Sequence, residues 1–227
     1  MGREVSALTS NQVSRRNIRL LILLSAAVYF SSYLTRLNYS AVLVEMIASE
    51  HYTRSAASAA LTGLFITYGA GQLLSGYLGD RIKPQLLIFA GLLVSAAMNL
   101  LIPLCPGTGL MTAVWCVNGL AQAMMWPPLV RILSELLSEA DYKTATVRVS
   151  WGSSLATILI YLTAPLFIQW GGWRLIFFVC AVFALVMAFV WIFCFRKLES
   201  KMRANRLVPV AHSAVNGKGT GIPSTLW

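Results

Sequence analysis

Residues Ile18–Met46 read IRLLILLSAAVYFSSYLTRLNYSAVLVEM, an apolar stretch with one arginine, Arg36, in its second half. The stretch is long enough for a membrane-spanning helix, which takes about 20 residues. An arginine near the middle of such a helix costs roughly 2.5–3.5 kcal/mol, so it is rare unless it faces a bundle interior or a water-filled cavity. Because a guanidinium is a permanently charged fork of donors, it suits phosphate or carboxylate. We therefore expect Arg36 to bind an anionic solute.

The whole chain has the composition of an all-α membrane protein. It has 227 residues, of which 57% are hydrophobic and only 11% are charged, whereas soluble domains carry about 25% charged residues. Apolar runs of this length indicate spanning helices. We predict six such helices, at Ile18–Met46, Ser55–Leu78, Gln85–Leu104, Leu110–Leu137, Thr144–Gln169 and Trp173–Phe195.

The basic residues divide unequally between the two sides of the predicted helices. Of the 18 Lys and Arg residues, all but Arg36, Arg54 and Arg174 fall on the side of the two termini if the helices alternate in direction. By the positive-inside rule, a multi-pass protein of the cell membrane with both termini in the cytoplasm is expected. A nucleic-acid-binding face would not divide between alternate loops, so the net charge of +10 does not indicate a nucleic-acid partner.

Three regions follow from this pattern. Residues 1–17 form a predicted cytoplasmic tail, and residues 18–195 form the transmembrane domain. Residues 196–227 are basic and then rich in Gly, Ser and Pro, so we expect a cytoplasmic linker that leads to a missing second half.

Polar residues form a stripe along the first predicted helix. Tyr29, Ser32, Tyr33 and Ser40 lie at offsets from Arg36 that share one helix face. No Asp or Glu lies deep in any predicted helix to neutralise the arginine. The stripe therefore favours an anion site with tyrosine hydroxyls beside a guanidinium. The alternative is a structural arginine bonded to carbonyl groups or to a carboxylate.

The end of the second predicted helix carries a motif. Residues Gly76 to Pro84 read GYLGDRIKP, which resembles the Gly-x-x-x-Asp-Arg signature between helices 2 and 3 of the major facilitator superfamily. The resemblance implies that the chain is one six-helix half of that fold. It also implies that this loop is a conformational latch, with Gly76, Asp80, Arg81 and Arg131 as gating residues. The simpler alternative is a solvated, charged turn.

Two further segments resemble the organophosphate:phosphate antiporter family, which includes glycerol-3-phosphate and hexose-phosphate transporters. They are YLTRLNY at Tyr33–Tyr39 and NGLAQAMMWPP at Asn118–Pro128. Trp151 also stands where the family has a tryptophan in helix 5. The resemblance implies a phosphate-binding role for Arg36. The other substrate-binding positions that it implies are Tyr29, Tyr33, Gln122, Trp126 and Trp151.

Three positions depart from the family pattern. Gln72 replaces the lysine of the glycerol-3-phosphate branch, and Gly152 and Leu155 replace the asparagine and histidine of helix 5. One cationic and one titratable contact are thus missing. A sugar acid is therefore a candidate solute beside sugar phosphate and glycerol phosphate.

The fourth predicted helix contains Pro127 and Pro128, which lack backbone donors and predict a kink. Arg131 and Glu135 are four residues apart near the cytoplasmic end of this helix. We weigh two partners for Arg131, a salt bridge to Glu135 and a pairing with Asp80 that holds the outward-facing state.

These features predict a secondary active transporter, an antiporter or symporter, that moves a small organic anion by alternating access. One alternative is a membrane sensor of an external anionic solute, and another is an inactive fragment of a longer transporter. We expect the lipid bilayer as surroundings and a second six-helix half as partner, from the same gene or from a second copy of the chain. The four cysteines lie at unrelated spacings and no carboxylate cluster is visible, so no enzyme, metal or cofactor is expected.

Overall fold

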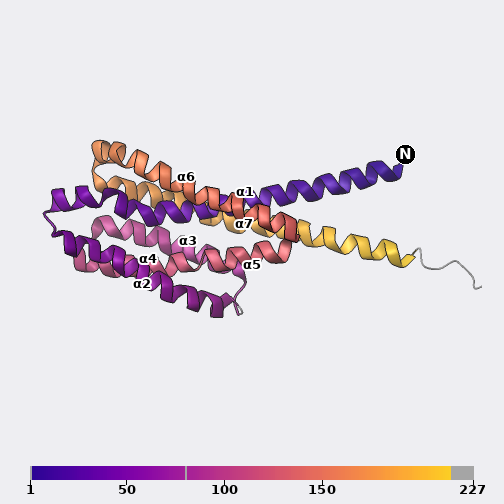
Figure 1. Cartoon of the computed structure of the whole chain (residues 1–227), viewed down its shortest axis with the longest axis horizontal. Coiled ribbons are helices and arrows are strands. Elements are labelled where there is room, and N and C mark those ends of the chain that lie inside the picture. The colour runs from indigo at the N-terminus through magenta and orange to yellow at the C-terminus, as the bar shows by residue number, and fades with distance from the viewer. Residues whose placement is uncertain (1, 80, 216–227) are drawn as a thin grey trace, which may run out of the picture.

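The computed structural model describes the backbone of residues 2–79 and 81–215, and the side chains of residues 15–79 and 81–202. The described chain is a bundle of long helices (Figure 1). Its elements are α1 Gly2–Glu50, α2 Arg54–Gly79, α3 Pro84–Leu101, the 3-10 helix η1 Ile102–Leu104, α4 Thr108–Ala123, α5 Trp126–Leu136, α6 Glu139–Gly171 and α7 Trp173–Val215.

Each of the six predicted spans has a helical counterpart, which confirms the all-α membrane fold. Four described segments are long and apolar enough to cross a membrane. They are Arg15–Glu50, Pro84–Leu104, Glu139–Gly171 and Trp173–Met202. The second span corresponds to α2, which is 26 residues long but less apolar, and the fourth is divided between α4 and α5.

The fourth span is broken where its sequence predicts a kink. Helix α4 ends at Ala123, and α5 begins at Trp126 with prolines in its first turn. Proline is tolerated there because the first amides of a helix have no partner within the helix. The amide of Leu129 bonds the carbonyl of Met125 at 3.2 Å, so the ladder resumes directly after the two prolines.

The predicted domain boundaries do not coincide with helix ends. Helix α1 already begins at Gly2, within the predicted tail, and α7 continues to Val215, well into the predicted linker. Hydropathy falls at these boundaries, but residues 196–207 contain no Gly or Pro and are mostly good helix formers. The apolar span therefore stops before the helix does. Residues 216–227 of the predicted linker lie outside the described part of the chain.

The two ends of the bundle differ in charge. The N-terminal part of α1 and the C-terminal part of α7 project beyond the same end (Figure 1). The loop from α2 to α3 lies at that end too, whereas the loop from α1 to α2 lies at the other (Figure 1). The described basic residues follow this division, with Arg54 and Arg174 at the far end. There Arg174 forms a 2.8 Å ion pair with Glu50, which joins α7 to the end of α1.

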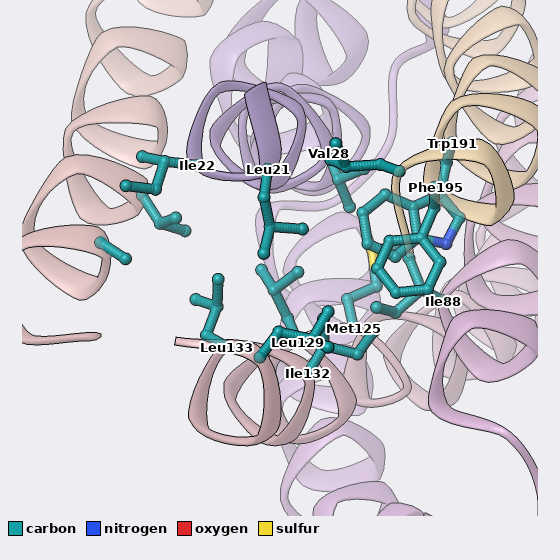
Figure 2. Packing of buried hydrophobic residues seen from close by; sticks show 14 of the residues in the cluster. Leu21, Ile22, Val28, Ile88, Met125, Leu129, Ile132, Leu133, Trp191 and Phe195 are labelled. Carbon is teal, nitrogen blue, oxygen red and sulfur yellow. The ribbon is translucent and has the colours of Figure 1, made fainter. Parts of the chain in front are cut away.

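Two apolar clusters fill the interior. The first lies toward the basic end, where Leu21 of α1 meets Leu129 and Leu133 of α5, and where Trp191 stacks on Phe195 within α7 (Figure 2). The second lies toward the far end and includes Tyr39, Trp115 and Phe177, whose rings are in mutual contact. Because lipid is as apolar as these side chains, van der Waals packing within the clusters stabilises the contacts between the helices.

Candidate functional site

The guanidinium of Arg36 lies between two tyrosine rings. Its Cζ is 4.1 Å from the ring centroid of Tyr33, on the preceding turn of α1, and 5.3 Å from that of Tyr68 on α2. Both distances are within cation–π range. Among the described residues, no carboxylate forms an ion pair with Arg36. The positive charge is therefore held by aromatic faces rather than neutralised by an acidic side chain.

A chain of aromatic contacts extends from this arginine to the broken fourth span. The ring of Tyr33 meets that of Tyr29 edge-on, with centroids 5.0 Å apart. Tyr29 in turn packs on Trp126, at 4.8 Å, in the first turn of α5. Of the predicted substrate-binding residues, Arg36, Tyr33, Tyr29 and Trp126 thus form one continuous group, and all are half-buried.

Helix α6 approaches the other side of the same stripe. The side chain of Tyr33 interacts with that of Ser153, and the hydroxyl groups of Ser40 and Tyr161 are 2.9 Å apart. Tyr68, Ser153 and Tyr161 were not predicted as site residues. A sequence signal exists for each, since a polar side chain within an apolar span rarely faces lipid.

Gln122 lies in the interior of the bundle in this structure, and its substrate-binding role stays a prediction. It is 2% exposed, and its side chain is satisfied by neighbouring protein groups. Its Oε1 accepts a 2.6 Å hydrogen bond from Ser32 Oγ, and its Nε2 donates to Thr35 Oγ1 and Ser95 Oγ, both at 3.0 Å. Gln122 therefore joins α1, α3 and α4 instead of lining an accessible surface.

This amide belongs to a buried polar layer that the sequence analysis missed. Asn38 Nδ2 donates to Asn99 Oδ1 at 2.6 Å, and Ser95 Oγ donates to Asn118 Oδ1 at 2.7 Å. Asn99 and Asn118 both donate to the carbonyl oxygen of Thr35, at 3.0 and 3.1 Å. On α4 the layer falls between the two apolar clusters, and on α1 and α3 it overlaps the near edge of the second cluster. It therefore fixes the crossing of these helices near the middle of the bundle.

Trp151 is exposed and does not join the aromatic group. Its side chain is 68% exposed, on a stripe of α6 that continues through Leu155, Ile158 and Leu162. Only 22% of the apolar window of α6 is buried, against 44–50% for the other three spans. Helix α6 thus presents a broad apolar face that no described part of the chain covers.

Close packing of α6 against α1 explains why a glycine stands at position 152. A Cβ at Gly152 would lie 2.6 Å from the carbonyl oxygen of Ala26 on α1. Backbone approaches of this kind need small residues at the helix interface. The asparagine that the related family carries at this position would not fit here without moving α6 away from α1.

The predicted gating residues lie at the basic end. Arg131 donates its Nη1 to the carbonyl oxygen of Gly79 at the end of α2, and its Nε to Glu135 Oε1 at 2.8 Å. The guanidinium of Arg81 lies 4.6 Å from the ring of Tyr77. Of the two partners weighed for Arg131, the salt bridge to Glu135 is present in this structure.

For the other two predicted gating residues, Gly76 and Asp80, the structure gives, among the residues that it describes, no contact that supports a gating role. A Cβ at Gly76 would meet nothing within 4 Å, so this glycine is not required by close packing in this conformation. Asp80 lies outside the described residues, and its pairing with Arg131 remains a prediction. Within the described part of the chain, no group of three or more His, Cys, Asp or Glu residues is arranged to hold a metal ion.

The fold and this arrangement agree with the family comparison. The sequence matches the Major Facilitator Superfamily over residues 25–222, and the chain belongs to this superfamily. In structure it is similar to the peptide transporter POT, with a TM-score of 0.68 at 15% identity over 88% of this chain and 47% of that one. At this identity, the likeness shows the fold alone.

Several curated proteins are similar to this chain in sequence. The probable hexose phosphate transport protein of Chlamydia muridarum is 26% identical over 164 residues, which cover 72% of this chain and 36% of the relative. The glycerol-3-phosphate transporter of Bacillus subtilis is 25% identical over 71% of this chain and 37% of its own length. The membrane sensor protein UhpC of Salmonella typhimurium is 26% identical over 86% and 43%. The chain thus spans less than half the length of these relatives.

Proposed function

We propose that this chain forms the N-terminal half of a secondary active transporter for a small organic anion. The candidate solutes are a sugar phosphate, a glycerol phosphate and a sugar acid. Support comes from the superfamily match and from the named functions of the similar phosphate-ester transporters. The anion would be held at Arg36 and exchanged across the membrane by alternating access, as antiport with phosphate or as cation-coupled uptake.

The single observation that carries this proposal is the environment of Arg36. The arginine lies in a spanning helix, and no described carboxylate pairs with it. Its Cζ lies over the rings of Tyr33 and Tyr68, and its side chain also interacts with that of Tyr33. Because a guanidinium carries five N–H donors in a fixed fork, contacts with two tyrosines leave donors for a bidentate anion. A bound anion would offset the cost of this charge within the membrane.

A second six-helix half would complete the binding site. The length of the relatives and the uncovered apolar face of α6 support this part of the proposal. The half would come from the same gene or from a second copy of the chain. Trp151 lies on that face and would meet the solute only in the complete assembly.

The orientation in the cell membrane follows from the charge distribution. The basic end of the bundle would face the cytoplasm, together with both termini. There the contact between Arg131 and Gly79, with Gly76, Asp80 and Arg81 nearby in sequence, would act as the latch that opens and closes during transport.

The decisive experiment compares Arg36→Lys with the native residue in the full-length transporter reconstituted in liposomes. We expect anion exchange to fall to background, because lysine keeps the charge but lacks the planar fork. The matched control is Arg174→Lys, which alters an arginine in the ion pair at the far end. Near-normal exchange by Arg36→Lys would contradict a bidentate role for this residue.

A membrane sensor is a second candidate, favoured by the similarity to UhpC over 86% of the chain. Binding and flux separate the two functions. A sensor would bind the anion through Arg36 without moving it across the membrane. A transporter half that lacks its partner would show neither activity until the second half is supplied, and an inactive fragment would gain none from it.

A further inference from the structure

A groove between α1 and α7 lies apart from the site around Arg36. It has a volume of about 450 Å³ and is open along the outer surface of these two helices. Leu20, Leu23 and Val190 form its exposed apolar walls. Their neighbours Leu21 and Trp191 point the other way, into the first apolar cluster (Figure 2). The groove is therefore walled by side chains that turn away from this cluster, while Met187 and Leu198, which belong to the cluster, also line it.

Polar groups are confined to one end of the groove. Because α1 and α7 run in opposite directions, Asn17 of α1 lies at the same end as Lys197 and Lys201 of α7. The two lysines are one helical turn apart and share a face. No acidic side chain lines the groove within the described residues. An anion at this end would thus meet two cations and no opposing charge.

Asn17 adds an unused donor. Its side chain is only 6% exposed, yet its Nδ2 has no hydrogen-bond partner among the described residues. A buried amide without a partner costs roughly 1–3 kcal/mol. Because Asn17 lines the groove, a rotation of its side chain would let a ligand held by the lysines accept this hydrogen bond.

The length of the groove matches one leaflet of a bilayer. From Asn17 to Ala27 the lining residues follow α1 for roughly 15 Å at 1.5 Å per residue, half of a hydrocarbon core of about 30 Å. The polar end is at the basic end of the bundle, and the apolar end reaches toward the middle. The groove therefore has the shape and polarity of a single lipid molecule.

We propose that this groove binds an anionic phospholipid of the leaflet on the basic side. One acyl chain would lie between α1 and α7, while the phosphate accepts hydrogen bonds from Lys197, Lys201 and Asn17. Basic pockets between spanning helices at this level bind anionic head groups in other membrane proteins. This site is independent of the transport proposed above, because none of its lining residues belongs to the Arg36 group.

The test is a titration of the delipidated, detergent-solubilised full chain with phosphatidylglycerol or phosphatidylcholine of the same acyl chains, followed by native mass spectrometry. We expect phosphatidylglycerol to bind more tightly. The double variant Lys197→Gln, Lys201→Gln should weaken phosphatidylglycerol binding by about thirtyfold, since each basic residue near the surface contributes about fivefold. Phosphatidylcholine binding should not change.

Two controls separate this groove from general surface charge and from misfolding. The variant Lys83→Gln, Arg196→Gln removes two charges at the same end, but neither residue lines the groove. It should keep the preference for phosphatidylglycerol. Replacement of both groove lysines by arginine keeps the charge and should restore binding. Equal losses in the two glutamine variants would overturn the proposal.

Asn17→Leu should change the stability of the protein and its lipid binding in opposite directions. Removal of an unpartnered buried donor should raise the thermal stability of the lipid-free protein, while phosphatidylglycerol binding becomes weaker. A purely structural asparagine would not show this combination. No change in phosphatidylglycerol affinity would remove Asn17 from the site.

Cys194 reports on occupancy in a Cys116→Ala background, because it lines the groove and is exposed, whereas Cys105 and Cys180 are buried and Cys116 is partly exposed. Its alkylation by N-ethylmaleimide should slow severalfold in phosphatidylglycerol but not in phosphatidylcholine. Two results would assign the groove to another occupant. Displacement of the lipid by inorganic phosphate would indicate a soluble anion, and a Cys194–Cys194 disulfide would indicate a second copy of the chain.

Discussion

Ser32 Oγ donates a 2.6 Å hydrogen bond to Gln122 Oε1, and this bond joins α1 to α4 one turn away from Arg36. Both residues are almost completely buried. The glutamine that the sequence placed beside the solute therefore has its side chain engaged within the protein. In this conformation its influence on the site is positional, because it fixes the rotation of α1 and hence the direction of Arg36.

Gln122→Leu should lower stability more than it alters anion recognition. The substitution removes three hydrogen bonds, each of about 0.6 kcal/mol on average in membranes, and leaves Ser32 and Ser95 without this partner. We expect a loss of about 1–2 kcal/mol, measured as the free energy of unfolding in detergent, with the preference among anions retained. Gln169→Leu, at an exposed position of α6, is the control. A changed preference among anions at unchanged stability would instead indicate direct contact with the solute.

The fold was predictable because its signals are local. Apolar runs of spanning length, the two prolines of the fourth span and the unequal loop charges are each visible within a short segment. The ends of α1 and α7 were not predictable in this way, since hydropathy marks the membrane boundary rather than the helix end. Gly2 and Val215 therefore lie far outside the predicted span limits.

The site was predictable in part. Arg36, Tyr33 and Tyr29 share one helix face, so their contact follows from helical spacing. The approach of Tyr68, by contrast, depends on how α2 rotates and packs against its neighbours, which spacing within a single helix does not determine. The same holds for Asn99, whose partners lie on other helices.

Tyr68 should contribute to anion binding through its ring. Tyr68→Leu removes one of the two aromatic faces that hold Arg36, whereas Tyr68→Phe keeps it. A cation–π contact of about 0.5–2 kcal/mol corresponds to roughly two- to thirtyfold weaker binding in the leucine variant. Calorimetric titration of the assembled transporter with its anion measures the difference. Tyr77→Leu, which removes the ring beside Arg81, is the control, and equal affinities of the Phe and Leu variants would exclude the ring contact.

Gly152→Ala should destabilise the packing of α1 against α6. The added Cβ would lie 2.6 Å from the carbonyl oxygen of Ala26, and overpacking of this kind costs about 1–3 kcal/mol. Gly69→Ala is a control for which we expect stability to rise instead of fall. A Cβ there meets nothing within 4 Å, so it should stabilise α2 by up to about 1 kcal/mol. Thermal unfolding of the two variants in one detergent measures both effects, and similar midpoints would argue against the close crossing.

Arg131 should couple the end of α2 to α5 through its fork of donors. One nitrogen bonds the carbonyl of Gly79 while another bonds Glu135, and a lysine has only one nitrogen for both. Arg131→Lys should therefore expose the end of α2, where the amides of Arg81 and Ile82 bond the carbonyl of Leu78. For a partly exposed contact of up to about 1 kcal/mol, hydrogen exchange at these amides should be up to about fivefold faster.

Glu135→Gln provides the matched comparison, because the contact of Arg131 with Gly79 remains. It should change hydrogen exchange at the end of α2 much less than Arg131→Lys does, and equal acceleration would assign the effect to the contact between Arg131 and Glu135 rather than to the contact with Gly79. The predicted partnership with Asp80 has a separate test. If the two charges pair during transport, either Asp80→Arg or Arg131→Asp alone abolishes exchange, and the double swap recovers it. Without recovery, the latch would depend on the Gly79 contact rather than on a charge pair.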